Sequence, residues 1–218
     1  SDARPTPSDA PPLDSPAHDG GPLRCEAQTW PTADYFVAPS GRAEASGRRD
    51  DPLSLATALS ASGPVRAGDR VEVAGGTYVG RFVADVSGSA DAPIVVAAAP
   101  GARVILDSNA AGEGAGVLFE GDYLELHGFE ITHSGERASA PEGVEMHGSR
   151  SRLVNCVLHD NSQGIGFWSS AVDSELYGNV IYNNGFEGPT RGHGHAIYTQ
   201  NASGTKPMKK GNAVLLAD

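Results

Sequence analysis

The chain has 218 residues, enough to bury a sizeable core in one domain, and its 28 Gly and 6% aromatic residues favour many tight turns over a helical bundle. Its formal net charge of −11 argues against a nucleic-acid partner, because neutralising phosphates requires clustered Lys and Arg. No run of about 18 apolar residues occurs in the sequence, so no transmembrane segment is predicted.

Residues 1–31 differ in composition from the remainder of the chain. They are rich in Pro, Asp and Ala and hold few apolar residues that could anchor a core. Such a segment cannot bury enough surface to offset its ordering entropy, so we expect a disordered leader before a domain at residues 32–218. The leader either acts as a spacer between a surface anchor and the folded domain or is a leftover N-terminal tail with no function.

A helix is predicted within residues 51–62, near the start of this domain. Pro52 suits a first helical turn, and acidic residues stand ahead of it. The apolar stripe of the predicted helix consists of Leu53, Leu55, Ala56 and Leu59. This helix would cover the first end of the domain, which a stack of repeats must cap.

One short pattern then recurs four times in the second half of the chain. A small residue is followed by alternating residues at 116–120 (GVLFE), 143–147 (GVEMH), 164–168 (GIGFW) and 196–200 (AIYTQ). The copies begin 27, 21 and 32 residues apart, which is typical of solenoid repeats. A second pattern, rich in Gly and Asn, starts at Leu126, Leu153 and Leu176. The period-2 alternation predicts strands that stack on their own copies, as in a parallel β-helix.

The earlier strands carry a family resemblance. The segments 35–41 (YFVAPSG), 67–78 (AGDRVEVAGGTY) and 92–107 (APIVVAAAPGARVILD) resemble the N-terminal half of bacterial right-handed parallel β-helix proteins. That superfamily includes pectate-lyase-like and chondroitinase-B-like polysaccharide lyases. The resemblance runs from about Ala33 to the end and implies an all-β fold, a right-handed parallel β-helix solenoid with an N-terminal capping helix.

The resemblance specifies activity less well than fold. It implies Ca²⁺ as a candidate cofactor, but the acidic calcium cluster and the Lys/Arg pair of the chondroitinase-B-like lyases find no match here. The paired aspartates of β-helix polygalacturonases are also unmatched, and residues 192–194 (GHG) only echo one of their motifs.

Stacking the four copies places their outward residues in two columns. The first column reads Leu118, Glu145, Gly166, Tyr198, and the second reads Glu120, His147, Trp168, Gln200. Gly166 would then leave a bare notch walled by Trp168, where a sugar ring could stack on the indole. The alternative is that Gly166 relieves strain and Trp168 covers the sheet.

The longest gap between copies holds residues 186–195, which re-enter the coil beside Tyr198. Long insertions in repeat proteins tend to carry functional groups on one face. In a lyase, Arg191 could neutralise the uronate carboxylate, while His195 or Tyr198 takes the C5 proton and protonates the leaving oxygen. The predicted catalytic residues are Arg191, His195, Tyr198 and Glu145. The predicted substrate-binding residues are His147, Gly166, Trp168, Gln200 and His193.

Other interpretations of this insertion stay open. It could be only a surface loop, or His193 and His195 could bind a transition metal together with Glu187 or Glu145. Calcium would instead require a dense cluster of oxygen ligands, which the sequence lacks, and no residue is assigned to a metal site.

The two cysteines and the end of the chain allow further expectations. Cys156 falls on an inward column with Phe129 and Asn179, so a buried free thiol is the default. Pairing with Cys25 is the alternative and would fit an oxidising compartment. Residues 211–216 begin another copy of the second pattern, so the coil looks incomplete there, and self-association through this open end is expected.

The sequence therefore predicts a carbohydrate-active β-helix protein that is extracellular, periplasmic or anchored at the cell surface. The favoured function is a polysaccharide lyase that cleaves a uronate-containing glycan. One alternative is an inverting glycoside hydrolase that uses Glu120 and Glu145, which would lie roughly 8 Å apart as diagonal neighbours. The other is a non-catalytic solenoid that binds glycans or builds a surface structure.

Overall fold

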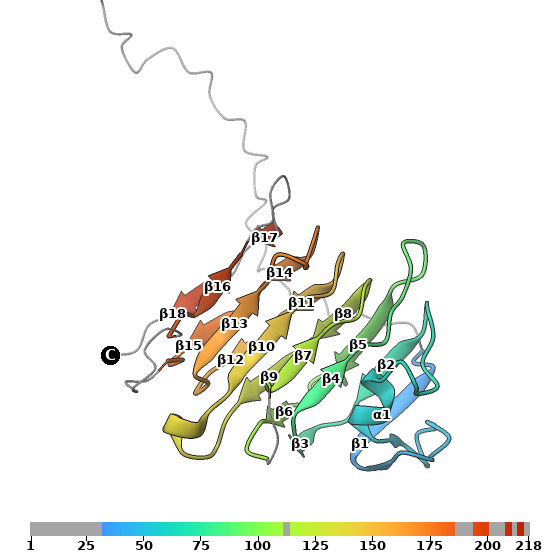
Figure 1. Cartoon of the computed structure of the whole chain (residues 1–218). Coiled ribbons are helices and arrows are strands. Elements are labelled where there is room, and N and C mark those ends of the chain that lie inside the picture. The colour runs from blue at the N-terminus through green and yellow to red at the C-terminus, as the bar shows by residue number, and fades with distance from the viewer. Residues whose placement is uncertain (1–31, 111–113, 186–193, 201–207, 211–212, 216–218) are drawn as a thin grey trace, which may run out of the picture. The chain divides into compact units, whose positions relative to one another are not determined.

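A computed structural model of the chain describes residues 32–110, 114–185, 194–200, 208–210 and 213–215. The predicted leader at residues 1–31 lies outside this part. The domain opens with β1 (Tyr35–Arg42) and α1 (Leu55–Leu59), after which the chain winds in rungs that each contribute one strand to three parallel sheets (Figure 1).

Five rungs of three strands are described, and a further rung begins after them. The first rung is β2 (Arg70–Val73), β3 (Gly76–Val79) and β4 (Phe82–Ala84). The second is β5 (Ile94–Ala98), β6 (Val104–Asp107) and β7 (Val117–Phe119). The third is β8 (Leu124–His127), β9 (Phe129–Thr132), β10 (Glu142–Met146), with the short 3-10 helix η1 (Arg137–Ser139) before β10. The fourth is β11 (Arg152–Val154), β12 (Val157–Leu158), β13 (Gln163–Phe167), and the fifth is β14 (Glu175–Tyr177), β15 (Val180–Tyr182), β16 (Ile197–Thr199).

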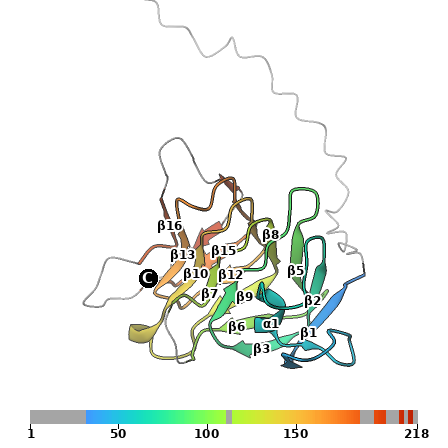
Figure 2. The same ribbon diagram turned by 45° about the vertical axis from the view of Figure 1, so that its right-hand side comes forward.

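The three sheets form the sides of a coil (Figure 2). The first sheet has the order β1-β2-β5-β8-β11-β14-β17, the second β18-β15-β12-β9-β6-β3 and the third β16-β13-β10-β7-β4. β17 (Met208–Lys210) pairs with β14, and β18 (Ala213–Leu215) pairs with β15. The further rung expected from the sequence of residues 211–216 is therefore present at Ala213–Leu215. Self-association through this end of the coil stays a prediction.

The predicted register of the third sheet is confirmed. Val117, Val144 and Ile165 are aligned on neighbouring strands, and so are Phe119, Met146 and Phe167 two positions later. All six side chains are fully buried. Their burial stabilises the coil because apolar area leaves water on every rung, at roughly 25 cal/mol per Å².

The second pattern forms the corner between the first and second sheets. Leu126, Leu153 and Leu176 are aligned in the first sheet, and two residues later the backbone turns through positive φ. Gly178 occupies this position with φ +67°, and a β-carbon there would lie 2.1 Å from Asn155 Oδ1. One position further, Asn179 accepts a hydrogen bond from the Cys156 amide and donates to the Leu153 carbonyl, so its role is structural.

The predicted capping helix is present but shorter than expected. It starts at Leu55 instead of near Pro52, because the Ser54 side chain caps it by accepting a hydrogen bond from the Thr57 amide. Leu53 is buried in an extended bridge outside the helix, and Ala56 is exposed. The buried helical face is Leu55, Ala58 and Leu59. This face packs against β1 and β4 at the first end of the coil (Figure 1).

Cys156 is a free and fully buried thiol on the inward column. Burial raises its pKa to about 12. The alternative disulfide is not formed in this structure, and Cys25 lies outside the described residues. Among the helices of the described part, none is long and apolar enough to cross a membrane.

Candidate functional site

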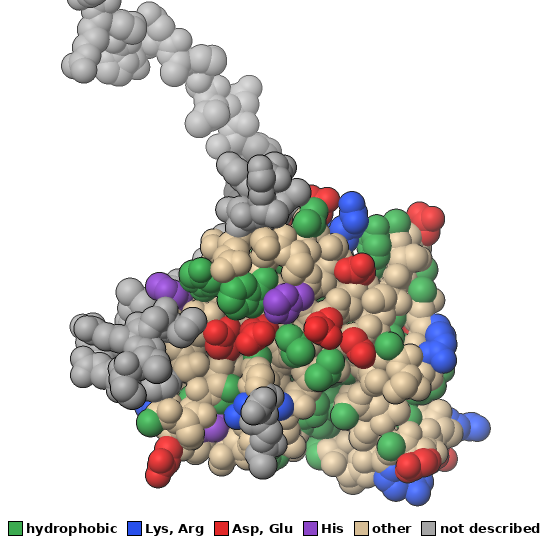
Figure 3. Space-filling model, in the orientation of Figure 1, with side chains coloured by type: hydrophobic (Ala, Val, Ile, Leu, Met, Phe, Trp, Pro, Cys, Tyr) green, Lys and Arg blue, Asp and Glu red, His purple; other side chains and the backbone are tan. Residues whose placement is uncertain are grey.

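The outer face of the third sheet carries the predicted columns in the predicted register. Leu118 aligns with Glu145, Glu145 with Gly166, and Gly166 with Tyr198. In Figure 3, hydrophobic and histidine side chains lie beside acidic ones over this sheet. The structure therefore collects residues from β10, β13 and β16 on one surface.

Four of the predicted site residues form a continuous strip of rings on this face. His147 stacks on Trp168 with ring centroids 5.8 Å apart and planes at 9°. Trp168 meets Tyr198 edge to face at 5.7 Å and 65°. His195 stacks on Tyr198 at 5.6 Å and 25°. Such a strip presents flat apolar surface and polar edges together, which suits a chain of sugar rings.

Polar contacts orient two members of the strip. His147 Nε2 lies 3.6 Å from Glu145 Oε2, and its Nδ1 lies 3.2 Å from the Ser170 hydroxyl. Gln200 Nε2 donates a hydrogen bond to the Tyr198 hydroxyl at 3.2 Å. Glu145 and His147 are partly exposed, with 27% and 36% of their side chains accessible. The structure thus brings together Glu145, His147, Trp168, His195, Tyr198 and Gln200 as expected.

Gly166 is not the open notch that the sequence predicted. The residue is buried, and a β-carbon there would lie 2.8 Å from Glu142 Oε2 and 3.0 Å from Trp168 Nε1. It would also lie 3.3 Å from Gln163 Nε2. Neighbouring side chains already fill the space over Gly166, so a sugar ring cannot sit directly on it. The glycine makes room for these polar atoms instead.

Glu142 and Gln163 are site residues that sequence reasoning missed. If inward and outward residues alternated strictly, Gln163 would point to the interior as Ile165 does. Its amide instead reaches Gly166 on the outer face. The alternation breaks at the small residue between them. A β-carbon on Gly164 would lie 2.4 Å from the Ala196 carbonyl oxygen and 2.8 Å from Ile181 Cγ2, which packs in the core. The repeated small residue at this position was the signal that could have revealed the break.

Two predicted residues, Arg191 and His193, lie outside the described residues, as does Glu187. No group of three or more His, Cys, Asp or Glu that could hold a metal ion occurs in the described part of the domain. Glu120 is exposed. Glu145 aligns with Leu118 on the neighbouring rung, so Glu120 lies one rung and two positions away from Glu145, as expected.

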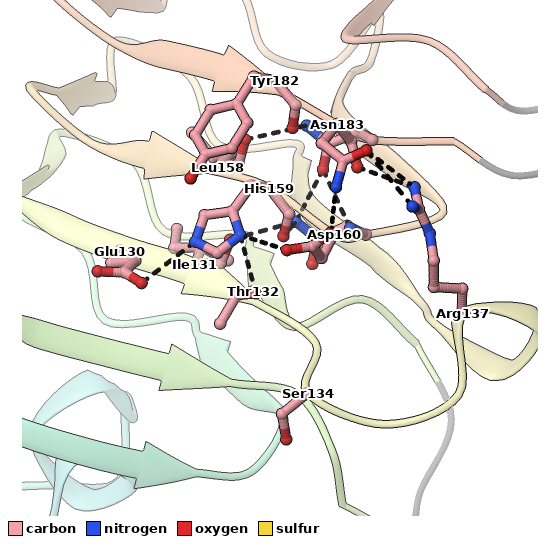
Figure 4. A network of polar contacts seen from close by, with 12 residues as sticks. Glu130, Ile131, Thr132, Ser134, Arg137, Leu158, His159, Asp160, Tyr182 and Asn183 are labelled. Carbon is pink, nitrogen blue, oxygen red and sulfur yellow. Dashed lines mark hydrogen bonds and ion pairs between the residues drawn. The ribbon is translucent and has the colours of Figure 1, made fainter. Parts of the chain in front are cut away.

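A second polar cluster lies on the outer face of the second sheet (Figure 4). His159 Nε2 is 3.1 Å from Glu130 Oε1, and its Nδ1 is 2.6 Å from Asp160 Oδ2. Arg103 binds Glu130 through two hydrogen bonds of 2.6 and 2.7 Å, which hold the pKa of that carboxyl below its usual value. The Tyr182 ring stacks on His159 at 5.0 Å. Both imidazole nitrogens of His159 are therefore engaged. The cluster ties neighbouring rungs together, because His159 directly follows β12 and contacts Glu130 of β9 and Tyr182 of β15.

Comparison with known proteins gives this geometry a context. A family model for the Pel9A-like, right handed beta helix region matches residues 35–205. Pectate lyase L of Thermoclostridium stercorarium is 27% identical over 143 residues, which are 64% of this chain and 11% of that protein. The crystal structure of pectate lyase Pel9A is similar with a TM-score of 0.58 and 26% identity, over 69% of this chain and 39% of that one.

The fold also matches an alginate lyase from Paenibacillus sp. str. FPU-7, with a TM-score of 0.60 and 24% identity over 75% of this chain and 55% of that one. The chain spans less than half the length of either pectate lyase. Since the family model covers most of the described domain, the chain belongs to the Pel9A-like right-handed β-helix family, a polysaccharide-lyase-like family.

Proposed function

We propose that the chain is an extracellular polysaccharide lyase that cleaves a uronate-containing glycan along the outer face of the third sheet. The observation that carries this proposal is the strip of four rings, His147, Trp168, Tyr198 and His195, in a member of this family. Ring strips bind sugars through stacking, and three of these rings, the two imidazoles and the phenol, also carry groups that transfer protons.

The reaction is a β-elimination. A base removes the C5 proton of the uronate, the bond between C4 and the glycosidic oxygen breaks, a C4–C5 double bond forms, and an acid protonates the leaving oxygen. His195 and Tyr198 supply the base and the acid, because they lie in contact on the exposed edge of the strip. The Arg191 side chain neutralises the uronate carboxylate, which makes the C5 proton easier to remove.

A panel of polysaccharides tests this function. Polygalacturonate, alginate and a neutral polymer are each incubated with the whole chain, and ultraviolet absorbance reports the new double bond while a colour assay reports reducing ends. We expect unsaturated product from at least one uronate polymer. His195→Ala and Tyr198→Phe should each lower its rate by about 100-fold or more, the usual size of acid–base contributions. Tyr177→Phe, which changes a tyrosine on the first sheet that is 52% exposed, is the matched control.

The other outcomes select the alternatives. Reducing ends without unsaturated product would replace the lyase by the inverting hydrolase with Glu120 and Glu145 as its carboxylate pair. Binding without either product would leave a glycan-binding solenoid.

A further inference from the structure

Apolar side chains on the first two rungs extend the ring strip. Val83 of β4 aligns with Leu118 of β7, and Leu118 aligns with Glu145 of β10. Val83 is 47% exposed, and Leu118 is partly exposed. Neighbouring strands lie roughly 4.8 Å apart, close to the length of one sugar unit. A glycan that stacks on the ring strip and continues across the rungs therefore reaches Leu118 and then Val83, and we call these two residues the apolar end of the strip.

Carboxylates border this path. Among the described residues of β4, β7, β10, β13 and β16, the only side chains with a formal charge are those of Glu142 and Glu145. Asp85 and Glu120 directly follow β4 and β7, which pair with each other. In Figure 3, acidic and hydrophobic side chains accordingly lie side by side over this sheet. A glycan that reaches the apolar end thus passes several negative charges.

Three arginines flank these strands in the sequence, and they do not offset the negative charge at the apolar end. Arg81 precedes β4 and Arg137 precedes β10, so both stand where the strands begin, whereas the carboxylates of Asp85 and Glu120 stand where the strands end. Arg150, which follows β10, lies 3.5 Å from Asp173 and is neutralised by it.

This charge discriminates between classes of uronate glycan. An unesterified polyuronate carries a carboxylate on every unit, and like charges repel over about 10 Å, the Debye length at 0.1 M salt. A methyl ester removes the charge of a unit and adds a methyl group that can contact Val83 and Leu118. A neutral glycan without such methyl groups would avoid the repulsion but would leave the apolar end without a partner.

We propose that the apolar end of the strip binds methyl-esterified uronate units, so that the preferred substrate is a partly methyl-esterified uronate polymer. This inference rests on the proposed function, because it assumes that the glycan lies on the third sheet. The unit at His195 and Tyr198 keeps the free carboxylate that the proposed reaction uses, and the units over Leu118 and Val83 carry the esters.

Calorimetric binding of oligogalacturonates tests the proposal. The protein is the whole chain with Tyr198→Phe, so that the probes are not consumed. The probes are two oligomers of equal length, one unesterified and one partly methyl-esterified, each measured at about 0.02 M and 0.5 M NaCl, where screening differs widely. Val83→Thr and Glu120→Gln are added singly, since each changes the polarity or the charge of the apolar end at similar side-chain volume.

Two further variants serve as matched controls. Val79→Thr makes the same change at a valine of the second sheet that is 61% exposed. Glu72→Gln removes one negative charge from the first sheet, where Glu72 pairs with Arg49. Neither control should alter the binding of either probe.

At low salt, the partly esterified probe should bind about tenfold more tightly, the effect of one or two repelled charge pairs in water. High salt should tighten binding of the unesterified probe and change that of the esterified probe little, because salt screens the repulsion. Glu120→Gln should reduce the preference about threefold by tightening binding of the unesterified probe. Val83→Thr should weaken binding of the esterified probe alone, by about three- to fourfold, the value of one buried methyl group.

Three results would overturn the inference. They are equal or tighter binding of the unesterified probe, weaker binding of that probe at high salt, and an effect of Val83→Thr no larger than that of Val79→Thr. Sedimentation that shows a dimer of the parent protein and a monomer of Val83→Thr would also overturn it, because a second copy of the chain would then cover the apolar end.

Failure of the inference can be told apart from failure of the proposed function. The expected binding preference without unsaturated product from wild type would remove the lyase function and leave the site for esterified units. Unsaturated product formed faster from polygalacturonate than from partly esterified polymer would keep the lyase and remove the site. Absence of binding to both probes would contradict both.

Discussion

A β-carbon on Gly164 would lie 2.4 Å from the carbonyl oxygen of Ala196 on the next rung. The same conflict recurs down the column, at 2.7 Å between Gly143 and the Gly164 oxygen and at 3.0 Å between Gly116 and the Gly143 oxygen. The small residue of the repeated pattern is therefore a packing requirement at the point where the third sheet begins.

Gly164→Ala should destabilise the domain by about 1–3 kcal/mol, because the added methyl meets backbone that cannot move aside as a side chain can. Chemical denaturation measures this loss. Gly194→Ala is the control, since its β-carbon would meet Gly185 Cα at 3.8 Å, an ordinary contact, and we expect a change within about 0.5 kcal/mol. Equal effects in both variants would contradict the packing argument.

Phe167→Asp should unfold the domain or cost at least about 4 kcal/mol, because it buries a charge without a partner in the core. Val83→Asp on the same sheet should be tolerated, since Val83 is 47% exposed. Melting temperatures compare the two. An unchanged value for Phe167→Asp would show that the inward register is wrong.

Acid should weaken the domain through Glu130. Hydrogen bonds from Arg103 lower its pKa in the folded state, so the unfolded chain binds the proton at higher pH. The stability from this carboxylate is complete above the unfolded pKa of roughly 4.3 and is lost as pH falls through the lower folded value. Urea midpoints at about pH 7 and pH 3 measure the loss. Glu130→Gln should show a smaller acid-induced loss than wild type, and an identical loss would exclude this carboxylate as a cause.

Cys156 should be unreactive in the native protein, because its thiol is buried and its pKa is raised to about 12. In a Cys25→Ser variant, a coloured thiol reagent should detect no thiol before unfolding and the single remaining thiol after it. Rapid reaction of the native variant would contradict the buried position. Unreduced wild type that shows no thiol even after unfolding would instead indicate the Cys25–Cys156 disulfide.

Arg191→Ala should lower turnover of a uronate glycan by about 100-fold, because a lost cation leaves the carboxylate charge unneutralised in the transition state. Turnover or binding of a neutral glycan should change far less. Arg49→Ala is the control, since Arg49 is an exposed residue that pairs with Glu72 on the first rung. Equal loss on acidic and neutral glycans would remove Arg191 from the proposed role.

The sequence alone determined the rungs and their register, because inward and outward residues alternate along each strand and every rung repeats the alternation of the one before. Ile165 and Phe167 could be assigned to the core, and Glu145, Trp168 and Tyr198 to the outer face, from this regularity.

The tertiary structure decided what happens where the regularity breaks. At Gly164 the close approach of the next rung interrupts the alternation, so Gln163 turns outward beside Gly166, which no period-2 pattern predicts. The length of α1 likewise depends on the Ser54 cap and on pairing of the Leu53 backbone with β1. The outward turn of Gln163 and the length of α1 follow from contacts between residues distant along the chain or from local hydrogen bonds. The periodicity of the residues predicts neither kind of contact.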